Sequence, residues 1–303
     1  MAIDAPATGC GGAACAPCAF AHAQPLCIGG ACAMGPCANG FADCDRDPSN
    51  GCEVDLRRDA GRCGSCLTAC TFTSPLCEDG ACTPRCKAVK LLESGARAAT
   101  KVGVAIDGDF TLELWLRWHG DFEASAAGAV FATTEALPTD GLVLGCSTEA
   151  GGQCTVRIVG GPGTVAPEVL IVAVPTGGWH HLAFQRAGGE LTAFVDGAPG
   201  PSVPSGTKLT ATSGVALGRT SQVPPRLAAP VSIGPVRLST IARYAGSFTP
   251  RRYLPSDAST ALSWLSSGAF DGSTLNDESG HSLDAAVGAP GLMTLDPLSP
   301  CAP

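Results

Sequence analysis

The sequence predicts a mainly β protein in two parts: a small, disulfide-rich, loop-dominated region over residues 1–86, and an antiparallel β-sandwich over residues 87–303. Three observations predict this division. Of the 17 cysteines, 14 lie in the first part. Short runs of alternating apolar and polar residues, separated by Gly and Pro, fill the second part. No window there sustains the 3.6-residue period of a helix over a dozen residues.

The first part contains an internal repeat. The stretch Pro25–Cys32, with the pattern Pro-Leu-Cys-x-x-Gly-Ala-Cys, recurs as Pro75–Cys82. Each copy follows a Cys-x-Phe and precedes one more cysteine. Each copy with its flanking cysteines, here called an arm, holds six cysteines. Cys44 and Cys52 lie between the two arms. An even count at repeated spacing predicts disulfides, whose pairing the sequence does not determine. Small modules need such cross-links because they bury too little apolar surface to fold unaided.

Zinc is the alternative for these cysteines, since Cys15-x2-Cys18 and Cys63-x2-Cys66 have the spacing of zinc ligands. The other cysteines are irregularly spaced, however, and His22 is the nearby histidine, so disulfides are favoured. The cysteines expected in disulfides are Cys10, Cys15, Cys18, Cys27, Cys32, Cys37, Cys44, Cys52, Cys63, Cys66, Cys70, Cys77, Cys82, Cys86, Cys146 and Cys154.

Two of these cysteines and one further cysteine lie in the second part. Cys146 and Cys154 flank a short turn, which predicts a disulfide across a hairpin. Cys301 has no assigned partner: it could bond back to the first part, stay free or bridge to another chain.

The disulfide framework predicts an oxidising compartment, and hence a secreted or cell-surface protein. The chain shows no signal peptide, so we expect that a leader has been removed. Residues 5–42 carry no charge but are rich in Gly, Pro and Cys, which excludes a membrane span there. The net charge of −8, without a basic patch, argues against nucleic acid as a partner. The excess of Arg over Lys is typical of a high-G+C bacterial gene.

A candidate calcium site lies in residues 41–56. Asp43, Asp45 and Asp47 alternate, so a loop could turn three carboxylates toward one Ca²⁺. The stretch does not match an EF-hand loop, because proline and valine stand where the turn glycine and the bidentate glutamate belong. The alternative is a solvated acidic turn, with Asn50-Gly51 forming a hairpin. Calcium is the one cofactor that the sequence suggests.

Residues 40–70 match the pattern GFxDCDxxPxNGCExDLxxDxxxCGxCxxxC. This stretch resembles the cysteine-rich repeat common in large bacterial surface proteins. The resemblance implies a module of that kind and says little about activity.

The second part contains several predicted strands. Alternation predicts strands at Phe110–Arg117 and Cys154–Val159, and two glycines predict a hairpin over Trp179–Val195. Val231–Leu238 and Ala261–Leu265 add further strands. Such strands in series argue for one antiparallel sandwich.

The motifs of the second part occur in a recognisable order, at Asp109–Leu116, Trp179–Arg186, Phe194–Gly197, Val236–Ser239 and Leu275–His281. Together they resemble the laminin-G-like, concanavalin A-like jelly roll in its bacterial form, over Val89–Ala289. The resemblance implies a binding module for glycans or protein surfaces, and many members hold a structural calcium.

That calcium site is not carried over to this chain. Gly234-Pro235 stands where the family has an acidic pair before the strand that begins at Val236. Asp107 and Asp109 are weaker candidates, because an Asp-Gly-Asp entering a strand is more often a turn.

Several aromatic residues and histidines receive structural interpretations. We interpret Trp115, Trp118 and Trp179 as core or rim residues rather than a sugar platform, because they lie inside strand patterns. His180 and His181 point to opposite faces of one strand, so they cannot jointly hold a metal. One of them is expected to be buried and the other exposed.

The enzyme hypothesis finds no catalytic motif in the sequence to support it. Concanavalin-type folds also include glycoside hydrolases and lyases, and hydrolysis needs two carboxylates about 5–10 Å apart. No Glu-x-Asp-x-(x)-Glu motif follows Cys86, and Glu113 stands alone in its strand. We therefore predict a non-enzymatic adhesion or binding protein whose partner is a glycan or an extracellular protein surface. The alternatives are a structural spacer of an extracellular assembly, and a hydrolase or lyase of this fold.

Overall fold

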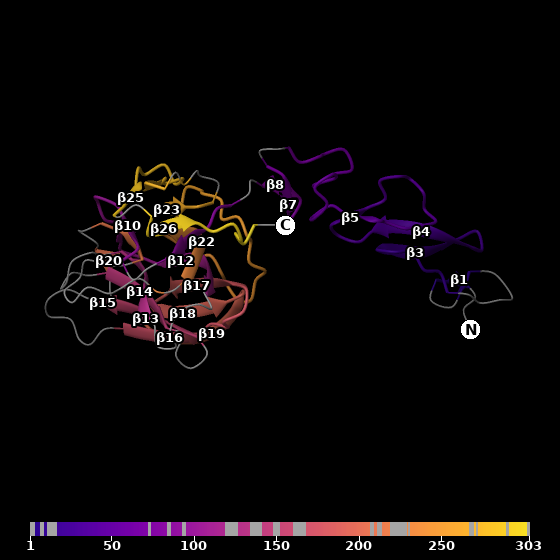
Figure 1. Ribbon diagram of the computed structural model, residues 1–303. Coiled ribbons are helices and arrows are strands. Elements are labelled where there is room, and N and C mark those ends of the chain that lie inside the picture. The colour runs from indigo at the N-terminus through magenta and orange to yellow at the C-terminus, as the bar shows by residue number, and fades with distance from the viewer. Residues whose placement is uncertain are drawn as a thin grey trace. The chain divides into compact units, whose positions relative to one another are not determined.

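The β-ladders of the protein are antiparallel throughout, and the described residues contain no helix (Figure 1). The computed structural model describes residues 4–6, 9–10, 17–71, 74–83, 86–92, 95–118, 127–133, 141–147, 152–159, 168–206, 209–210, 214–218, 229, 231–266, 270, 272–288 and 291–301. Two units result, Met1–Arg85 and Cys86–Pro303. The mainly β class is confirmed. No described helix is long and apolar enough to span a membrane.

The first unit consists of short hairpins. They are β1 (Asp4–Ala5) with β2 (Gly9–Cys10), β3 (Ala23–Ile28) with β4 (Ala31–Cys37), β5 (Phe41–Ala42) with β6 (Val54–Asp55), and β7 (Leu76–Glu78) with β8 (Ala81–Thr83). The two copies of the sequence repeat form β3–β4 and β7–β8, so the repeat in sequence is a repeat in structure (Figure 1).

The disulfides of the two hairpins follow one plan. Cys27 faces Cys32 across β3–β4, and Cys77 faces Cys82 across β7–β8. In both hairpins the facing cysteines bond outward to residues that precede the hairpin. The four bonds are Cys10–Cys27, Cys18–Cys32, Cys63–Cys77 and Cys70–Cys82.

Two further disulfides tie the arms to the stretch between them: Cys37 of the first arm bonds to Cys52, and Cys66 of the second arm bonds to Cys44. The zinc alternative fails for Cys18, Cys63 and Cys66, because their sulfur atoms are in disulfides. Cys15 lies outside the described residues. The cysteines of the first 86 residues do not all pair with one another, because Cys86 forms a disulfide with Cys301. This bond answers the question of the Cys301 partner.

The second unit is a sandwich of two large sheets (Figure 1). Sheet I has the order β16 (Glu168–Ala173), β15 (Gln153–Val159), β14 (Gly141–Ser147), β13 (Ala127–Ala132), β21 (Ala216–Gly218), β10 (Arg97–Ala99), β25 (Ala285–Val287) and β24 (Thr274–Leu275). Sheet II has the order β19 (Ala198–Pro204), β18 (Glu190–Val195), β17 (Trp179–Ala187), β12 (Phe110–Trp118), β22 (Val231–Ser239), β9 (Val89–Leu91) and β26 (Met293–Leu295), with β23 (Thr260–Trp264) also paired to β22. A small ladder joins β11 (Ala105–Ile106) to β20 (Leu209–Thr210).

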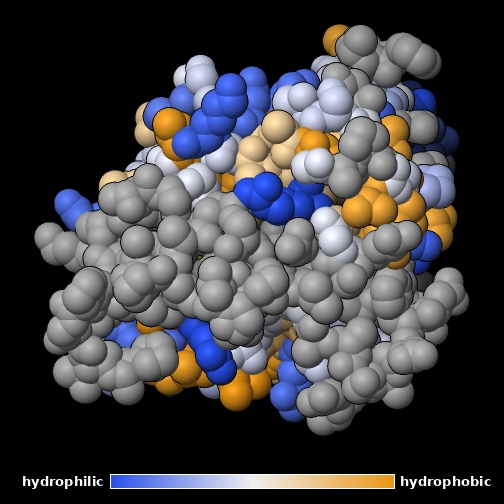
Figure 2. All heavy atoms as spheres, turned by 60° about the vertical axis from the view of Figure 1, so that its left-hand side comes forward, coloured by the Kyte–Doolittle hydropathy of each residue, from blue (hydrophilic) through white to orange (hydrophobic). Residues whose placement is uncertain are grey.

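The predicted strands and the predicted hairpin are present. β17 and β18 form the hairpin, and a disulfide joins Cys146 to Cys154 across β14 and β15. The face of the second unit seen in Figure 2 mixes hydrophilic and hydrophobic described residues in small groups, which is typical of a water-exposed surface.

The central strand of sheet II is buried on both faces. Leu112 and Leu114 of β12 point into the core between the sheets, as the alternation predicts. Thr111 and Glu113 point to the other face and are also fully buried. Residues 240–256, here called the strap, lie against that outer face, where Ile241 and Tyr244 hydrogen-bond to Thr111 and Glu113. The strap is therefore the element that positions the site described next.

Candidate functional site

A pocket of about 460 Å³ opens on the outer face of sheet II. It is built from three parts of the chain: sheet II, the strap, and residues 296–301, here called the C-terminal segment. Its lining residues are Trp115, Trp179, Asp196, Pro250, Arg252, Ser299 and Pro300.

Sheet II contributes two indole rings. Trp115 faces His181, and Trp179 faces Arg117, across the β12–β17 ladder, so the two tryptophans are diagonal neighbours on one face. Nε1 of Trp115 donates to the carbonyl of Arg251 at 3.0 Å. Since Trp179 Nε1 donates to a backbone carbonyl of the C-terminal segment, both ring N–H groups are satisfied. The rings are partly exposed and offer apolar surface to the pocket.

Asp196 contributes a carboxylate from a tight turn. Asp196 and Gly197 connect β18 to β19 with φ of 51° and 78°, as a two-residue hairpin turn with positive φ requires. The Oδ1 atom accepts a hydrogen bond from the His181 backbone N–H at 2.9 Å, and Oδ2 lies 2.7 Å from Nδ1 of His180. Gly197 has no space for a side chain, because a Cβ would lie 1.8 Å from the carbonyl oxygen of Phe248. The carboxylate is thus held in place while its side chain stays about half exposed.

The strap is anchored by a buried charge. Oε1 of Glu113 accepts a hydrogen bond from Nε of Arg237 at 2.8 Å, and Oε2 accepts one from the Tyr244 hydroxyl at 2.5 Å. Nε2 of His181 lies 3.3 Å from the same Oε2. Burial alone would raise the pKa of Glu113, but the hydrogen bond from His181 and the positive charge of Arg237 outweigh burial and lower the pKa to about 2. Glu113 is therefore ionised at neutral pH and holds the strap at Tyr244.

Aromatic contacts continue this anchor toward the pocket. The rings of Tyr244 and Phe248 are stacked, with centroids 3.5 Å apart. Phe248 also contacts the ring of His181 edge-on, and His181 contacts Trp115 in the same way, at 5.4 Å. Nδ1 of the fully buried His181 has no hydrogen-bond partner among the described residues. Trp115 is thus held by its ring contact with the buried His181 as well as by its hydrogen bond to Arg251.

The C-terminal segment begins at a second anchor. The Asp296 carboxylate lies 2.6 Å from the Arg117 guanidinium and also accepts a hydrogen bond from Ser232. Burial by itself would raise the pKa of Asp296, but these partners lower it. The Arg117 guanidinium lies 5.5 Å from the centre of the Trp179 ring. One arginine therefore links the C-terminal segment to an aromatic wall of the pocket.

The tryptophans and histidines singled out in the sequence differ in location and burial. Trp118 is a core residue, whereas Trp115 and Trp179 line the pocket while packing against its walls. His181 is fully buried, while the side chain of His180 is 14% exposed. The pocket residues of the strap and of the C-terminal segment escaped sequence reasoning, because neither segment has a regular pattern.

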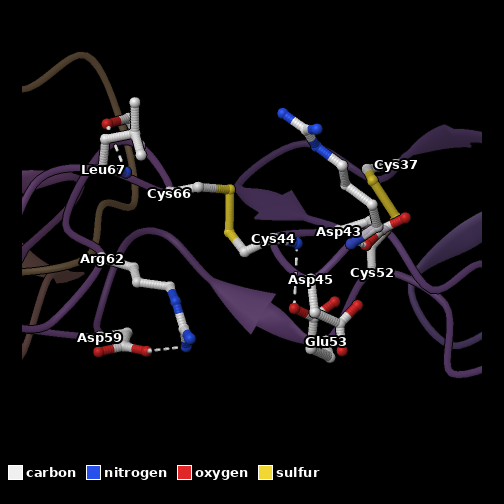
Figure 3. Close-up of a disulfide and its surroundings, with 12 residues drawn as sticks. Cys37, Asp43, Cys44, Asp45, Cys52, Glu53, Asp59, Arg62, Cys66 and Leu67 are labelled. Carbon is white, nitrogen blue, oxygen red and sulfur yellow. Dashed lines mark hydrogen bonds and ion pairs between the residues drawn. A yellow bond between two sulfur atoms is a disulfide. The ribbon is translucent and has the colours of Figure 1, made fainter.

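The acidic loop of the first unit brings together a different set from the one predicted. Ligand oxygens of Asp43, Asp45 and Glu53 lie within 4.8 Å of one another, beside the Cys44–Cys66 bond (Figure 3). Asp47 is not in this set, and its carboxylate accepts a hydrogen bond from the Ser49 N–H. Oxygen ligands of this kind suit Ca²⁺.

The loop already uses several of these oxygens itself. Asp43 Oδ1 accepts from Arg46 N at 2.6 Å, and Asp45 Oδ1 accepts from Asp47 N at 2.9 Å. That backbone N–H, together with the Asn50 amide, lowers the pKa of Asp45. The arrangement is that of a hydrogen-bonded acidic turn. Calcium binding here stays a prediction.

Asp109, one of the two weaker candidates in the second unit, serves a turn. Oδ1 of Asp109 accepts a hydrogen bond from the Gly188 N–H at 3.0 Å, which ties the start of β12 to the β17–β18 turn.

Comparison with known proteins bears on the second unit. Residues 93–245, just over half of the chain, match a laminin G family model described as the concanavalin A-like lectin/glucanases superfamily. No curated protein sequence matches the chain.

Comparison with solved structures finds proteins of low sequence identity to the chain. A candidate carbohydrate binding protein from Bacteroides ovatus is 14% identical, with a TM-score of 0.49 over 76% of this chain and 65% of its own. Domains LG4-5 of the mouse laminin α1 chain are 16% identical, with a TM-score of 0.41 over 53% of this chain and 45% of their own. The chain thus spans less than two thirds of each of these proteins.

Proposed function

The chain belongs to the concanavalin A-like lectin/glucanases superfamily, and from this premise we propose that its second unit is a non-enzymatic binding module of a secreted or cell-surface protein. The pocket between Trp115 and Trp179 binds a saccharide unit of a glycan. One observation carries this assignment: two indole rings with satisfied N–H groups share an open pocket with the carboxylate of Asp196 and the guanidinium of Arg252.

The chemistry of the pocket matches that of a sugar ring. A sugar presents apolar C–H faces and a rim of hydroxyl groups, each of which both donates and accepts hydrogen bonds. Indole rings are suited to the apolar faces. Asp196 accepts hydrogen bonds and Arg252 donates them, so both functions of the hydroxyl rim find partners. The volume lies within the range of about 300–1,000 Å³ that is typical of ligand pockets.

The distribution of carboxylates favours binding over hydrolysis. Glycoside hydrolysis uses two carboxyl groups, one of which donates a proton. Asp196 is the one carboxylate among the described lining residues. Glu113 is fully buried and its pKa of about 2 keeps it ionised, so it cannot act as a general acid at neutral pH.

The disulfides support the proposed location and the role of the first unit. Eight disulfides join described cysteines, and such bonds persist in oxidising compartments. We assign the first unit the role of a cross-linked spacer for the binding module.

A glycan array probed with the full chain tests the proposal. We expect saturable binding to one sugar class. Asp196→Asn and Arg252→Ala should each weaken it by about tenfold, because each removes a charged hydrogen-bonding partner. Arg157→Ala is the matched control, since Arg157 is exposed on β15 of sheet I.

Two results would contradict the proposal. One is the absence of saturable binding to any sugar, which would favour the spacer alternative or a protein surface as the partner. The other is binding that Arg252→Ala and Arg157→Ala affect equally, which would place the sugar elsewhere.

A further inference from the structure

One wall of the pocket ends at a disulfide. Ser299 and Pro300 line the pocket, and the next residue, Cys301, is bonded to Cys86. Both cysteines are almost completely buried, at 1% and 2% exposure. The bond therefore lies inside the unit, directly behind the wall.

Cys86 is attached to a rigid part of the sandwich. It precedes β9, which pairs with β22 through Val89 and Ile233, and with β26 through Leu91 and Met293. The N–H of Lys87 also donates to the carbonyl of Leu265 at 2.9 Å. Cys86 is thus a fixed anchor for whatever bonds to it.

The C-terminal segment is attached to sheet II mainly at its start, where Asp296 binds Arg117 and Ser232. It leaves β26 after a backbone hydrogen bond from Asp296 N–H to the Ala88 carbonyl, at 2.8 Å. Beyond that point, Leu298 N–H bonds to Asp296 and Cys301 N–H bonds to Ser299, both inside the segment. Bonds within the segment shape it but do not tie it to the sheet.

The segment meets the pocket closely at two places. The carbonyl of Leu298 accepts the Trp179 indole N–H. Pro300 packs over Gly234, where an added Cβ would lie 2.7 Å from Pro300 Cγ and 3.0 Å from Trp115 Cβ. The wall formed by Ser299 and Pro300 therefore lies against both tryptophans.

The disulfide also reaches the opposite wall. Sγ of Cys301 lies 3.4 Å from the carbonyl oxygen of Arg252, and the neighbouring carbonyl of Arg251 accepts the Trp115 indole N–H. The same disulfide thus contacts the strap at Arg252, which lines the pocket.

We propose that the Cys86–Cys301 disulfide is a positioning element of the pocket. It holds Ser299 and Pro300 against Trp115 and Trp179, so that the pocket keeps its shape only while this bond is intact. The effect on sugar affinity rests on the proposed function, whereas the position of the wall does not. Tryptophan exposure therefore tests the inference separately from sugar binding.

The experiment compares two double variants of the full chain. Cys86→Ser/Cys301→Ser removes the proposed positioning bond without leaving a free thiol at either position. Cys146→Ser/Cys154→Ser is the matched control, because it removes the other disulfide of the second unit, between β14 and β15 of sheet I. The measurements are acrylamide quenching and emission wavelength of tryptophan fluorescence, the circular dichroism of the sheets, and affinity for the sugar found on the array.

Release of the wall should expose Trp179. We expect Cys86→Ser/Cys301→Ser to raise the quenching constant by about twofold and shift the emission to the red, with β-sheet dichroism retained, because only a local segment detaches. Sugar affinity should fall at least about tenfold through lost preorganisation. Replacing both pocket tryptophans in this background, by Trp115→Phe/Trp179→Phe, should abolish the added quenching, since Trp118 and Trp264 remain in the core. The control should show neither change.

A single substitution moves the same wall with the disulfide in place. Gly234→Ala puts a methyl group where Pro300 now sits, so quenching should rise and affinity fall, by less than in the double variant. This variant also decides the case if Cys86→Ser/Cys301→Ser does not fold.

Native quenching in Cys86→Ser/Cys301→Ser, or an equal rise in the Cys146→Ser/Cys154→Ser control, would overturn the inference. Native quenching and affinity in Gly234→Ala would overturn it as well. A third outcome separates the two proposals. If tryptophan quenching rises in Cys86→Ser/Cys301→Ser but the native chain binds no sugar, the positioning role is upheld and the proposed function is refuted.

Discussion

The two units of the molecule bury different kinds of side chain. Among the described residues of the first unit, the buried hydrophobic side chains are Cys18, Cys52, Cys63 and Val54. The second unit instead has a continuous core of Leu, Val, Ile, Phe and Trp between its two sheets. Disulfides therefore provide most of the stability of the first unit. In the second unit the hydrophobic core provides most of the stability, and disulfides contribute less.

The difference follows from how each kind of stabilisation works. A disulfide that closes a loop of about 15 residues stabilises a fold by roughly 3 kcal/mol, mainly by restricting the unfolded chain. The bonds of the first unit span separations of 12 to 22 residues, so each falls near this value. Apolar burial instead scales with the area removed from water. The first unit should therefore respond to redox conditions and the second to core substitutions.

Full reduction should give the largest effect. With every disulfide reduced, the first unit should lose its structure, while the second keeps its sheets, because its core does not depend on the bonds. Limited proteolysis followed by mass mapping would show new cleavages within residues 17–83 and, in the second unit, only in the C-terminal segment, which the Cys86–Cys301 bond no longer holds. Oxidised protein is the control, and protection of residues 17–83 after reduction would show that disulfides are not what stabilises the first unit.

Glu113→Gln should give the next largest effect. The substitution leaves the buried Arg237 without its charge partner, which costs about 3–5 kcal/mol in comparable buried pairs. Thermal unfolding of the second unit would measure the loss. Glu190→Gln is the control, because Glu190 is exposed on β18 of the same sheet. Equal unfolding temperatures for the two variants would show that the strap is held by packing alone.

Acid should remove the same contribution in the unmodified chain. The pKa of Glu113 is lowered in the folded state from 4.5 to about 2, so the folded state favours the ionised form. Its stabilisation is complete above pH 4.5 and is lost as pH falls from there toward about 2. The gap in unfolding temperature between native chain and Glu113→Gln should narrow over that range. A constant gap would contradict the assignment.

A pair of alanine substitutions, one in each unit, should give the smallest effects. Leu114→Ala in the core of the second unit should cost about 2–5 kcal/mol. Val54→Ala in the first unit should cost only about 1–2 kcal/mol, because a smaller side chain is truncated and disulfides carry the fold. Leu67→Ala, at a residue 96% exposed, is the control for the first unit. Chemical unfolding measures all three, and equal costs at Val54 and Leu114 would contradict the distinction.

The sheets were predictable from sequence because strand alternation is a local signal. Phe110–Arg117 alternates, and the two glycines before Leu191 mark the β17–β18 turn. The burial of Glu113 was not predictable, since it depends on the strap, which has no regular pattern. The same local signals produced the family resemblance, which the family match confirms.

The pocket could not be predicted because it joins distant parts of the chain. Trp115, Trp179, Arg252 and Pro300 meet only after the strap and the C-terminal segment fold onto sheet II. A bond from Cys301 back to the first part was one of three alternatives that the sequence left open, and the Cys86–Cys301 disulfide confirms it. The sequence could not single out Cys86 as the partner, because 215 positions separate the two cysteines.

That long-range bond also sets how the second unit responds to mechanical load. The chain enters the unit at Cys86, and Cys301 lies at its other end. A pulling force applied across these two points travels through one sulfur–sulfur bond, and the intervening chain stays slack. The rows of sheet hydrogen bonds bear none of the tension. Tension between the two ends of the second unit can therefore cross it without extending the sandwich.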